Sequence, residues 1–563
     1  MGIVRSAHPS SPALMEVRGL NVSFSTPEGR VNAVKDVSFQ IAAGEILAVV
    51  GESGSGKSVM ARTLVGLAGG RAEVRAEAMS LFGQDRRALD LLSLSERAWR
   101  QVRGREIGFV LQDALVSLDP LRTVGREVAE ALLAHGMLSH SQVAGRVEEL
   151  LGRVGISDPE NRAAQYPHEL SGGLRQRALI ASALAAEPRL LIADEPTTAL
   201  DLVLQRQILT IFKDLALQGH AVLIITHDLS VAAQLADRVI VMKQGEVVEE
   251  GPGHTVLSSP RESYTQSLLA AVPTVAKRDC WLSRSGARPI RKAIVELGAP
   301  LLEVRDISAS FRRPDGTRQD AMKGVCLKVG RGETVGVVGE SGSGKTTLAK
   351  IALSLHSPDR GEVLFEGKPW SKLPERERRS RRGLIQVINQ EPRSTFDPRY
   401  TVERIIQQPL ILRTRLNRTE RRARAADLMA LVGLSPELLP RRPNTLSGGQ
   451  RQRVSIAQAL AAEPKLLICD EPVSALDVTT QAQVLDLLID LQDRLGLSMV
   501  FISHDLGVVQ HMSNRVAVMK DGLIVETGLT EEIFNDPQHP YTRDLIAAMP
   551  SFSRITENTA RLV

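Results

Sequence analysis

Two stretches of this sequence combine glycines, a lysine and a hydroxyl side chain in an order that suits a bound polyphosphate. Glycines let backbone N–H groups approach phosphate oxygens closely, the lysine reaches the outer phosphates, and the final hydroxyl can hold a magnesium ion. Each stretch follows an apolar run, at 46–50 and 334–338, that is typical of a buried parallel strand. The residues predicted to bind a nucleotide with Mg²⁺ are Gly51, Glu52, Ser53, Gly54, Ser55, Gly56, Lys57 and Ser58 in the first stretch, and Gly339, Glu340, Ser341, Gly342, Ser343, Gly344, Lys345, Thr346 and Thr347 in the second.

Two pairs of adjacent carboxylates complete the chemistry that such a loop needs. Asp194–Glu195 and Asp470–Glu471 each follow four apolar residues. A buried strand would therefore place them at the carboxyl edge of a sheet, where open α/β sheets bind ligands. One carboxylate can serve the metal, and the other can polarise water for attack on the γ-phosphate. We predict that Asp194 and Asp470 belong to the metal sites and that Glu195 and Glu471 are catalytic.

The motifs recur in the same order along both halves of the chain. Lys57 and Lys345 lie 288 residues apart, and Ser171 and Ser447 lie 276 apart. A repeat of this length is a domain. Apolar runs with turn signals predict antiparallel strands at the start of each half, and charged Ala, Leu, Arg and Glu-rich sequence predicts helical insertions at 86–165 and 374–443. The predicted organisation is an N-terminal tail (1–13), a first ATPase domain (14–273), a basic linker (274–299) and a second ATPase domain (300–563).

Composition narrows the class of protein further. The chain has 563 residues, of which 43% are hydrophobic, so it can bury two cores. No run approaches the roughly 18 apolar residues of a membrane span, and the first residues lack the apolar block of a secretory signal. Three dispersed cysteines argue against a disulfide framework. The expected location is cytoplasmic. Basic runs at 376–382 and 418–424 are interpreted as solvated helix faces, with an anionic membrane or nucleic acid as the alternative contact.

With the Leu-Ser-Gly-Gly segments that begin at residues 170 and 446, these motifs resemble the ATP-binding cassette superfamily over nearly the whole chain. The resemblance implies an α/β fold with two tandem P-loop ATPase domains, each with a RecA-like core, an antiparallel β subdomain and an inserted α-helical subdomain. It also implies that the two domains pair within one chain, so that Lys57 works with the second signature and Lys345 with the first. The signature residues are Ser171, Gly172, Gly173, Ser447, Gly448 and Gly449.

The resemblance assigns further residues to the two sites. Gln112 and Gln390 would touch magnesium and sense a transmembrane partner, and His227 and His504 would contact the γ-phosphate. Phe24 and Phe311 occupy the positions at which the family stacks an aromatic ring on adenine, although each could equally be a core residue. The first signature continues with Leu174 where the second has Gln450. This difference leaves open whether the two sites work at the same rate.

The end of the chain resembles the tail of the oligopeptide, dipeptide and nickel importer ATPases. The second half ends with residues 536–542, which read Asp-Pro-Gln-His-Pro-Tyr-Thr, and the first half keeps Tyr264–Thr265 but has Glu262–Ser263 in place of His539–Pro540. The resemblance implies an ATP-hydrolysing motor for import of peptides or related solutes. Its expected partners are two integral-membrane permeases and an external solute-binding protein, with the chain peripheral on the cytoplasmic face of the bacterial inner membrane.

Two other classes remain as alternatives at this stage. A soluble tandem cassette protein acting on ribosomes or nucleic acid would suit the basic runs, but the short linker, the tail and the lack of an obvious nucleic-acid module disfavour it. A scaffold that binds nucleotide without turnover conflicts with two intact Asp-Glu pairs. The transported substrate stays open among peptides, glutathione-like thiols, nickel chelates and other small solutes.

Overall fold

The computed structural model describes residues 13–26, 29–83, 85–112, 117–197, 200–273, 280–284, 299–312, 318–390, 392–413 and 416–549. Nearly all of the predicted N-terminal tail, most of the predicted linker and the last residues of the chain lie outside these ranges. The chain divides into two compact units, Met1–Leu269 with Pro550–Val563, and Ala270–Met549.

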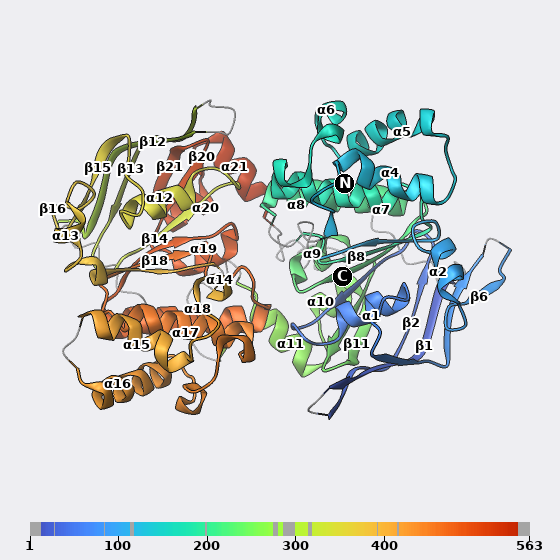
Figure 1. The fold of residues 1–563 in the computed structure, drawn as a ribbon, viewed down its shortest axis with the longest axis horizontal. Coiled ribbons are helices and arrows are strands. Elements are labelled where there is room, and N and C mark those ends of the chain that lie inside the picture. Colours follow the sequence, from blue (N-terminus) through green and yellow to red (C-terminus); the bar gives the residue numbers. More distant parts are fainter. Residues whose placement is uncertain are drawn as a thin grey trace. The chain divides into compact units, whose positions relative to one another are not determined.

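The core of the first unit is a mainly parallel six-stranded sheet (Figure 1). Its strand order is β11-β10-β3-β9-β8-β7, and only β11 runs antiparallel to its neighbour. Strands β3, β8 and β9 are buried along their whole length, as their continuous apolar sequence predicts. The strands are β3 (Ile46–Val50), β7 (Ile107–Val110), β8 (Leu190–Asp194), β9 (Ala221–Thr226), β10 (Arg238–Lys243) and β11 (Glu246–Pro252).

A second, antiparallel sheet forms the start of this unit. Its order is β2-β1-β5-β6, with β4 also paired to β1. The buried residues of β1, with those that alternate with exposed residues along the second half of β2, pack into a core cluster shared with β3 and α1. The strands are β1 (Ala13–Thr26), β2 (Gly29–Ala42), β4 (Ala72–Arg75), β5 (Ala78–Phe82) and β6 (Ala88–Asp90).

Helices occupy the stretch between β7 and β8 and the connections of the parallel sheet. Helices α4, α5, α6 and α7 contact one another as the inserted helical region. This region begins later than the predicted residue 86, because 86–110 supplies β6, α2 and β7 instead. The helices are α1 (Lys57–Leu64), α2 (Glu96–Val102), α4 (Val124–Ala134), α5 (His140–Arg153), α6 (Pro159–Ala164), η1 (Pro167–Glu169), α7 (Gly172–Leu184), α8 (Leu202–Leu217), α9 (Leu229–Leu235), α10 (Gly253–Ser258) and α11 (Ser263–Ala270).

The second unit repeats this architecture. Its six-stranded sheet has the order β17-β18-β19-β14-β20-β21, and its antiparallel sheet the order β13-β12-β15-β16. The strands are β12 (Leu302–Arg312), β13 (Arg318–Val329), β14 (Thr334–Val338), β15 (Arg360–Phe365), β16 (Lys368–Pro369), β17 (Ile385–Ile388), β18 (Leu466–Asp470), β19 (Ser498–Ile502), β20 (Arg515–Lys520) and β21 (Leu523–Leu529).

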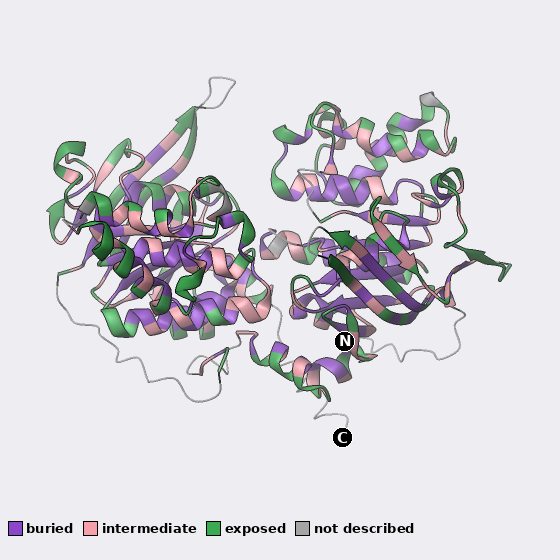
Figure 2. Cartoon of the chain, turned by 60° about the horizontal axis from the view of Figure 1, so that its bottom comes forward, coloured by how far each residue is buried: buried purple, intermediate pink, exposed green. Residues whose placement is uncertain are grey.

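Helices α15, α16 and α17 pack together as the inserted region of the second unit (Figure 1). Figure 2 shows that buried residues gather in the sheet strands and on the inward faces of the helices. The helices are α12 (Lys345–Ala352), α13 (Glu375–Arg378), η3 (Arg382–Leu384), α14 (Pro392–Thr395), α15 (Val402–Arg413), α16 (Arg418–Leu431), η4 (Pro436–Leu438), η5 (Pro443–Thr445), α17 (Gly448–Leu460), α18 (Val478–Leu495), α19 (Leu506–Met512), α20 (Thr530–Asn535) and α21 (Pro540–Ala547). The predicted combination of parallel core, antiparallel sheet and helical insertion is therefore confirmed in both units.

A short piece of the predicted linker packs on the second unit. The buried carboxylate of Asp486, in α18, accepts hydrogen bonds from the backbone N–H groups of Leu282 and Ser283 at 3.1 and 2.8 Å, and from the Ser283 hydroxyl at 2.7 Å. The Leu282 side chain is buried as well. Residues 280–284 are thus fastened to α18 by these hydrogen bonds. Across the described ranges, no helix has the length and apolar character needed to traverse a bilayer.

Candidate active sites

Each glycine-rich loop wraps around the amine of its own lysine. The Lys57 Nζ donates to the carbonyl oxygens of Gly51 and Glu52 at 2.8 and 2.7 Å, and Lys345 makes the matching bonds to Gly339 and Glu340 at the same distances. Both lysines are buried and stand at the first position of a helix, α1 or α12. The loop therefore combines a positive charge with the N–H groups of a helix start, which is an arrangement that binds phosphate.

The first glycine of each loop is required by its surroundings. Gly51 has a φ of 149°, and a Cβ there would lie 2.2 Å from the carbonyl oxygen of Met242. Gly339 has a φ of 153°, and its Cβ would lie 2.1 Å from the carbonyl oxygen of Met519. Because atoms cannot approach so closely, any side chain would push the loop away from β10 or β20.

The loop hydroxyl and the aspartate at the end of the buried strand of each unit form a site that fits Mg²⁺. The Ser58 hydroxyl donates to Asp194 Oδ1 at 2.9 Å, while the fully buried Asp194 Oδ2 has no hydrogen-bond partner. Burial raises the pKa of Asp194, and it also raises the pKa of Asp470, which is hydrogen-bonded by Thr346. Their surroundings therefore disfavour the ionised form of these aspartates, and a cation beside the carboxylate oxygens would stabilise it.

The donor set resembles the way proteins hold magnesium. Among the described residues, no group of three or more His, Cys, Asp or Glu side chains forms a cluster of metal ligands. Mg²⁺ commonly binds through one or two carboxylates, waters and the phosphates of its nucleotide. One aspartate and one hydroxyl per unit are therefore enough protein ligands for it.

A glutamine and a histidine flank each predicted catalytic glutamate. In the first unit, Gln112 Nε2 donates to Glu195 Oε2 at 2.9 Å, and His227 Nδ1 lies 3.2 Å from Glu195 Oε1. In the second unit, Gln390 Nε2 donates to Glu471 Oε2 at 3.0 Å, and a His504 Nδ1 to Glu471 Oε2 distance of 3.2 Å completes the group. The structure thus brings together the glutamates, glutamines and histidines that the sequence predicted separately.

The backbone at both glutamates is left-handed. Glu195 has a φ of 50° and Glu471 a φ of 48°. This conformation costs a residue with a side chain about 1–2 kcal/mol. The N–H of Glu195 nevertheless donates to Ile225 O at 2.8 Å, and that of Glu471 to Ile502 O at 3.0 Å. The chain therefore turns sharply after β8 and β18, but the neighbouring strand holds the turning residue in place.

Each histidine has a raised pKa because a glutamate lies beside it. Burial lowers the pKa of His227, but the hydrogen bond and charge of Glu195, with the charge of Asp228, outweigh it and raise the pKa above its usual value. His504 behaves in the same way. Burial tends to raise the pKa of Glu471, yet the hydrogen bond and charge of His504 bring it below its usual value. Glu471 is therefore ionised at neutral pH.

The two signature segments begin helices, but their caps differ. Ser447 caps α17, since its Oγ accepts the Gln450 N–H at 3.2 Å and the Gln450 side chain accepts the Ser447 N–H at 3.0 Å. Ser171 caps α7 with one longer bond, from Leu174 N at 3.5 Å. Leucine cannot return the second hydrogen bond of this capping box. The pairing of Lys57 with Ser447 and of Lys345 with Ser171 stays a prediction.

Comparison with known proteins decides the family. A family model described as ABC transporter matches residues 34–198 and 322–474. The chain belongs to the ABC transporter family. A second model, described as oligopeptide/dipeptide transporter, C-terminal region, matches 248–299 and 525–562, which confirms the predicted resemblance of both tails.

Individual relatives of this ABC ATPase span most of its length. It is 42% identical over 557 residues to the glutathione import ATP-binding protein GsiA of Salmonella choleraesuis, with 95% of this chain and 89% of that protein covered. The same identity holds over 559 residues to the protein of that name from Escherichia coli (strain K12), with the same coverage. A solved ABC transporter subunit from Clostridium perfringens matches 46% of this chain and 100% of its own at 28% identity and a TM-score of 0.39.

The predicted adenine-stacking residues of this ABC ATPase lie in different surroundings. Phe24 is partly buried and packs against the core cluster of the antiparallel sheet. Phe311 is exposed and stacks on His356, with ring centroids 4.8 Å apart. The contacts of Phe24 suit the core interpretation, and the exposed ring of Phe311 suits stacking. An adenine contact stays a prediction for both.

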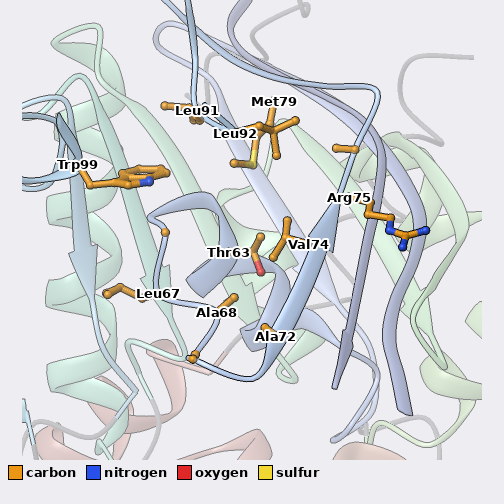
Figure 3. Close-up of a pocket in the computed structure, with 14 residues that line it drawn as sticks. Thr63, Leu67, Ala68, Ala72, Val74, Arg75, Met79, Leu91, Leu92 and Trp99 are labelled. Carbon is orange, nitrogen blue, oxygen red and sulfur yellow. The ribbon is translucent and has the colours of Figure 1, made fainter. Parts of the chain in front are cut away.

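A cavity of about 750 Å³ in the first unit lies away from the phosphate loop. Figure 3 shows Trp99, Leu91, Met79 and Val74 around it, with Thr63 from the last turn of α1. Thr63 is six residues beyond Lys57, which is about 9 Å along a helix axis. The cavity therefore does not belong to the phosphate site.

Sequence reasoning missed one residue in each site. The hydroxyls of Tyr264 and Tyr541, from the two tail helices, accept the backbone N–H groups of Glu52 and Glu340 in the phosphate loops. The available signal was that the first tail keeps Tyr264 although the His-Pro pair before it is lost.

Proposed function

We propose that this chain is the ATP-hydrolysing subunit of an ABC importer for peptides or a related small solute such as glutathione. The observation that carries the proposal is the match of both tails to the oligopeptide/dipeptide C-terminal region, one in each half. The 42%-identical relatives, which are glutathione import ATP-binding proteins, support the same class of substrate.

The geometry of the sites supports hydrolysis in both halves. Lys57 and Lys345 would bind the outer phosphates of ATP. Ser58, Asp194 and Gln112 in the first unit, and Thr346, Asp470 and Gln390 in the second, would hold Mg²⁺, which supplies neutralisation of phosphate charge when bound. The described residues of the two units show the same contacts around each of these groups.

The proposed chemical step is attack of water on the γ-phosphate. Glu195 or Glu471 would accept the proton of the attacking water, which requires an ionised carboxylate. In the second unit, the hydrogen bond from His504 lowers the pKa of Glu471 and so favours the ionised carboxylate. Each histidine would also reach toward the γ-phosphate, as the resemblance to the family implies.

The proposal includes partners that form the transport pathway. They are two integral-membrane permease subunits and an external solute-binding protein, with this chain peripheral on the cytoplasmic face of the bacterial inner membrane. ATP binding and hydrolysis would drive the permeases between their two states.

The basic runs give little support to a nucleic-acid partner. Arg378 and Arg382 both pair with Glu375, and Arg424 pairs with Glu463. Part of the positive charge is therefore already matched by acidic side chains of the same unit. This pattern favours the interpretation of these runs as solvated helix faces.

The decisive experiment is capture of the native chain from membranes extracted with a gentle detergent, followed by mass spectrometry. We expect two multispan permeases, with or without a solute-binding protein. In parallel, cells lacking the chain should lose uptake of labelled dipeptide or glutathione. Wild-type chain should restore uptake, whereas the Glu195→Gln, Glu471→Gln double variant should still capture the permeases without restoring it. Recovery of ribosomal or nucleic-acid partners without permeases would overturn the proposal.

A further inference from the structure

Each tail helix contacts the phosphate loop of its own unit through one tyrosine. The Tyr264 hydroxyl, from α11, accepts the Glu52 N–H at 3.2 Å, and the Tyr541 hydroxyl, from α21, accepts the Glu340 N–H at 3.1 Å. We propose that Tyr264 and Tyr541 are positioning residues that hold the two phosphate loops in their nucleotide-binding shape. The inference rests on the proposed function of these loops as ATP sites.

The peptide unit that receives the tyrosine also orients the lysine. The N–H of Glu52 and the carbonyl of Gly51 belong to one planar peptide group. The tyrosine bonds its N–H side, and the Lys57 Nζ bonds its carbonyl side at 2.8 Å. In the second unit, Tyr541 and Lys345 share the peptide group between Gly339 and Glu340 in the same way. Rotation of this group would therefore displace the lysine that reaches the phosphates.

The tyrosine rings are themselves held from other directions. A lysine amine lies 4.5 Å from each ring centroid, Lys243 over Tyr264 and Lys520 over Tyr541. The start of each tail is bound to the preceding strand, because Glu249 accepts the N–H groups of residues 261 and 262, and Glu526 those of residues 538 and 539. These contacts fix the position of the tyrosine ring, and so of the hydroxyl that bonds the loop.

The two tails differ in sequence just before the tyrosine, and this difference shows whether the tyrosine contact depends on how the tail helix begins. The first tail has Glu262–Ser263 where the second has His539–Pro540, and the His539 side chain caps α21. Despite this change, Tyr264 makes the same bond to its loop as Tyr541, to within 0.1 Å. The tyrosine contact therefore does not depend on the His-Pro pair that gives the second tail its helix start.

The test uses the full chain and the variants Tyr264→Phe and Tyr541→Phe, which keep the ring and remove the acceptor oxygen. Loss of one hydrogen bond predicts a rise of roughly three- to tenfold in the KM for ATP at the altered site, with kcat changed by less than about twofold. Direct binding of ATP should weaken by the same factor in the Glu195→Gln, Glu471→Gln background. Tyr400→Phe is the matched control, since Arg404 lies 3.8 Å from that ring centroid but the residue precedes α15 and contacts neither loop among the described residues.

A double-mutant cycle ties the effect to the hydrogen bond. Glu340→Pro removes the N–H donor, so adding Tyr541→Phe to it should leave the KM for ATP unchanged. The inference is overturned if Tyr541→Phe lowers the unfolding midpoint but leaves the KM for ATP at its wild-type value, or if its effect persists in full beside Glu340→Pro. Failure of the wild-type chain to bind ATP would instead overturn the proposed function.

Discussion

The two glutamates provide the sharpest test of the active-site assignment. Glutamine has the size of glutamate and keeps one side-chain oxygen, but it cannot accept the proton of an attacking water. Removal of a general base slows a reaction by about 10²–10⁴, which corresponds to roughly 3–5 kcal/mol in the activation barrier. The loops that bind phosphate are untouched by this change. We therefore expect the Glu195→Gln, Glu471→Gln double variant to bind ATP with wild-type affinity and hydrolyse it at below about 1% of the wild-type rate.

The single variants measure how the two sites share the work. The glutamine contacts of the two glutamates are 2.9 and 3.0 Å, and both histidine contacts are 3.2 Å. Sites so alike should contribute about equally, so each single variant should keep about half of the rate if the sites act independently. Phosphate release under saturating Mg²⁺ and ATP gives the rate, and equilibrium binding of ATP gives the affinity.

Two other glutamates serve as controls for the backbone. Glu187 and Glu463 share the left-handed conformation, with φ values of 53° and 51°, and each precedes the catalytic glutamate of its unit by eight residues. Both lie on the surface, where they pair with arginines. Their change to glutamine should leave hydrolysis intact. A double Glu195→Gln, Glu471→Gln variant that retained more than about a tenth of the wild-type rate would refute the assignment of the general base.

Three further outcomes follow from the electrostatics and caps of the sites. In the nucleotide-free protein, burial raises the pKa of Asp194, so the folded state loses stability as pH rises through that pKa and the carboxyl group ionises. Asp194→Asn should therefore raise the unfolding midpoint at pH 8 in a chelator by roughly 2–4 °C, and by less at acid pH. The same variant should abolish Mg²⁺-dependent hydrolysis at that site. His504→Gln removes the interactions that lower the pKa of Glu471, so the acid limb of the pH–rate profile, measured with the first site disabled, should move to higher pH. Gln450→Leu should remove one bond of the capping box of α17 and destabilise that unit by about 0.5–1 kcal/mol in denaturant titration. Leu174→Gln should stabilise the other unit by less than this, because Leu174 also packs against the core cluster.

The chemistry of the sites was largely readable from the sequence. Continuous apolar runs predict β3, β8, β14 and β18, because strands covered on both faces need no polar residues, and the motifs that follow such runs must meet at one sheet edge. The start of the helical insertion was harder to predict from the sequence. Residues 86–110 have helical composition, but β7 forms there because it pairs with β8, some eighty residues away.

The remaining features depend on tertiary contacts that leave little local signal. The left-handed backbone of Glu195 opposes the preference of glutamate and exists because Ile225, on the next strand, accepts its N–H. The bond from Glu52 to Tyr264 joins residues 212 positions apart. Neither residue type nor spacing reports such a contact, although the persistence of the tyrosine in both tails hints at a shared task.

The attachment of residues 280–284 to α18 has a practical consequence for dividing this protein into two polypeptides. A second half that began at residue 300 would lose Leu282 and Ser283. The buried carboxylate of Asp486 would then lack three hydrogen-bond donors, and the residues that now cover the buried Leu282 side chain would be exposed. A break placed before Cys280 keeps both. The C-terminal half from a cut near 275 should therefore be soluble when expressed, whereas the half from a cut at 300 should be aggregation-prone.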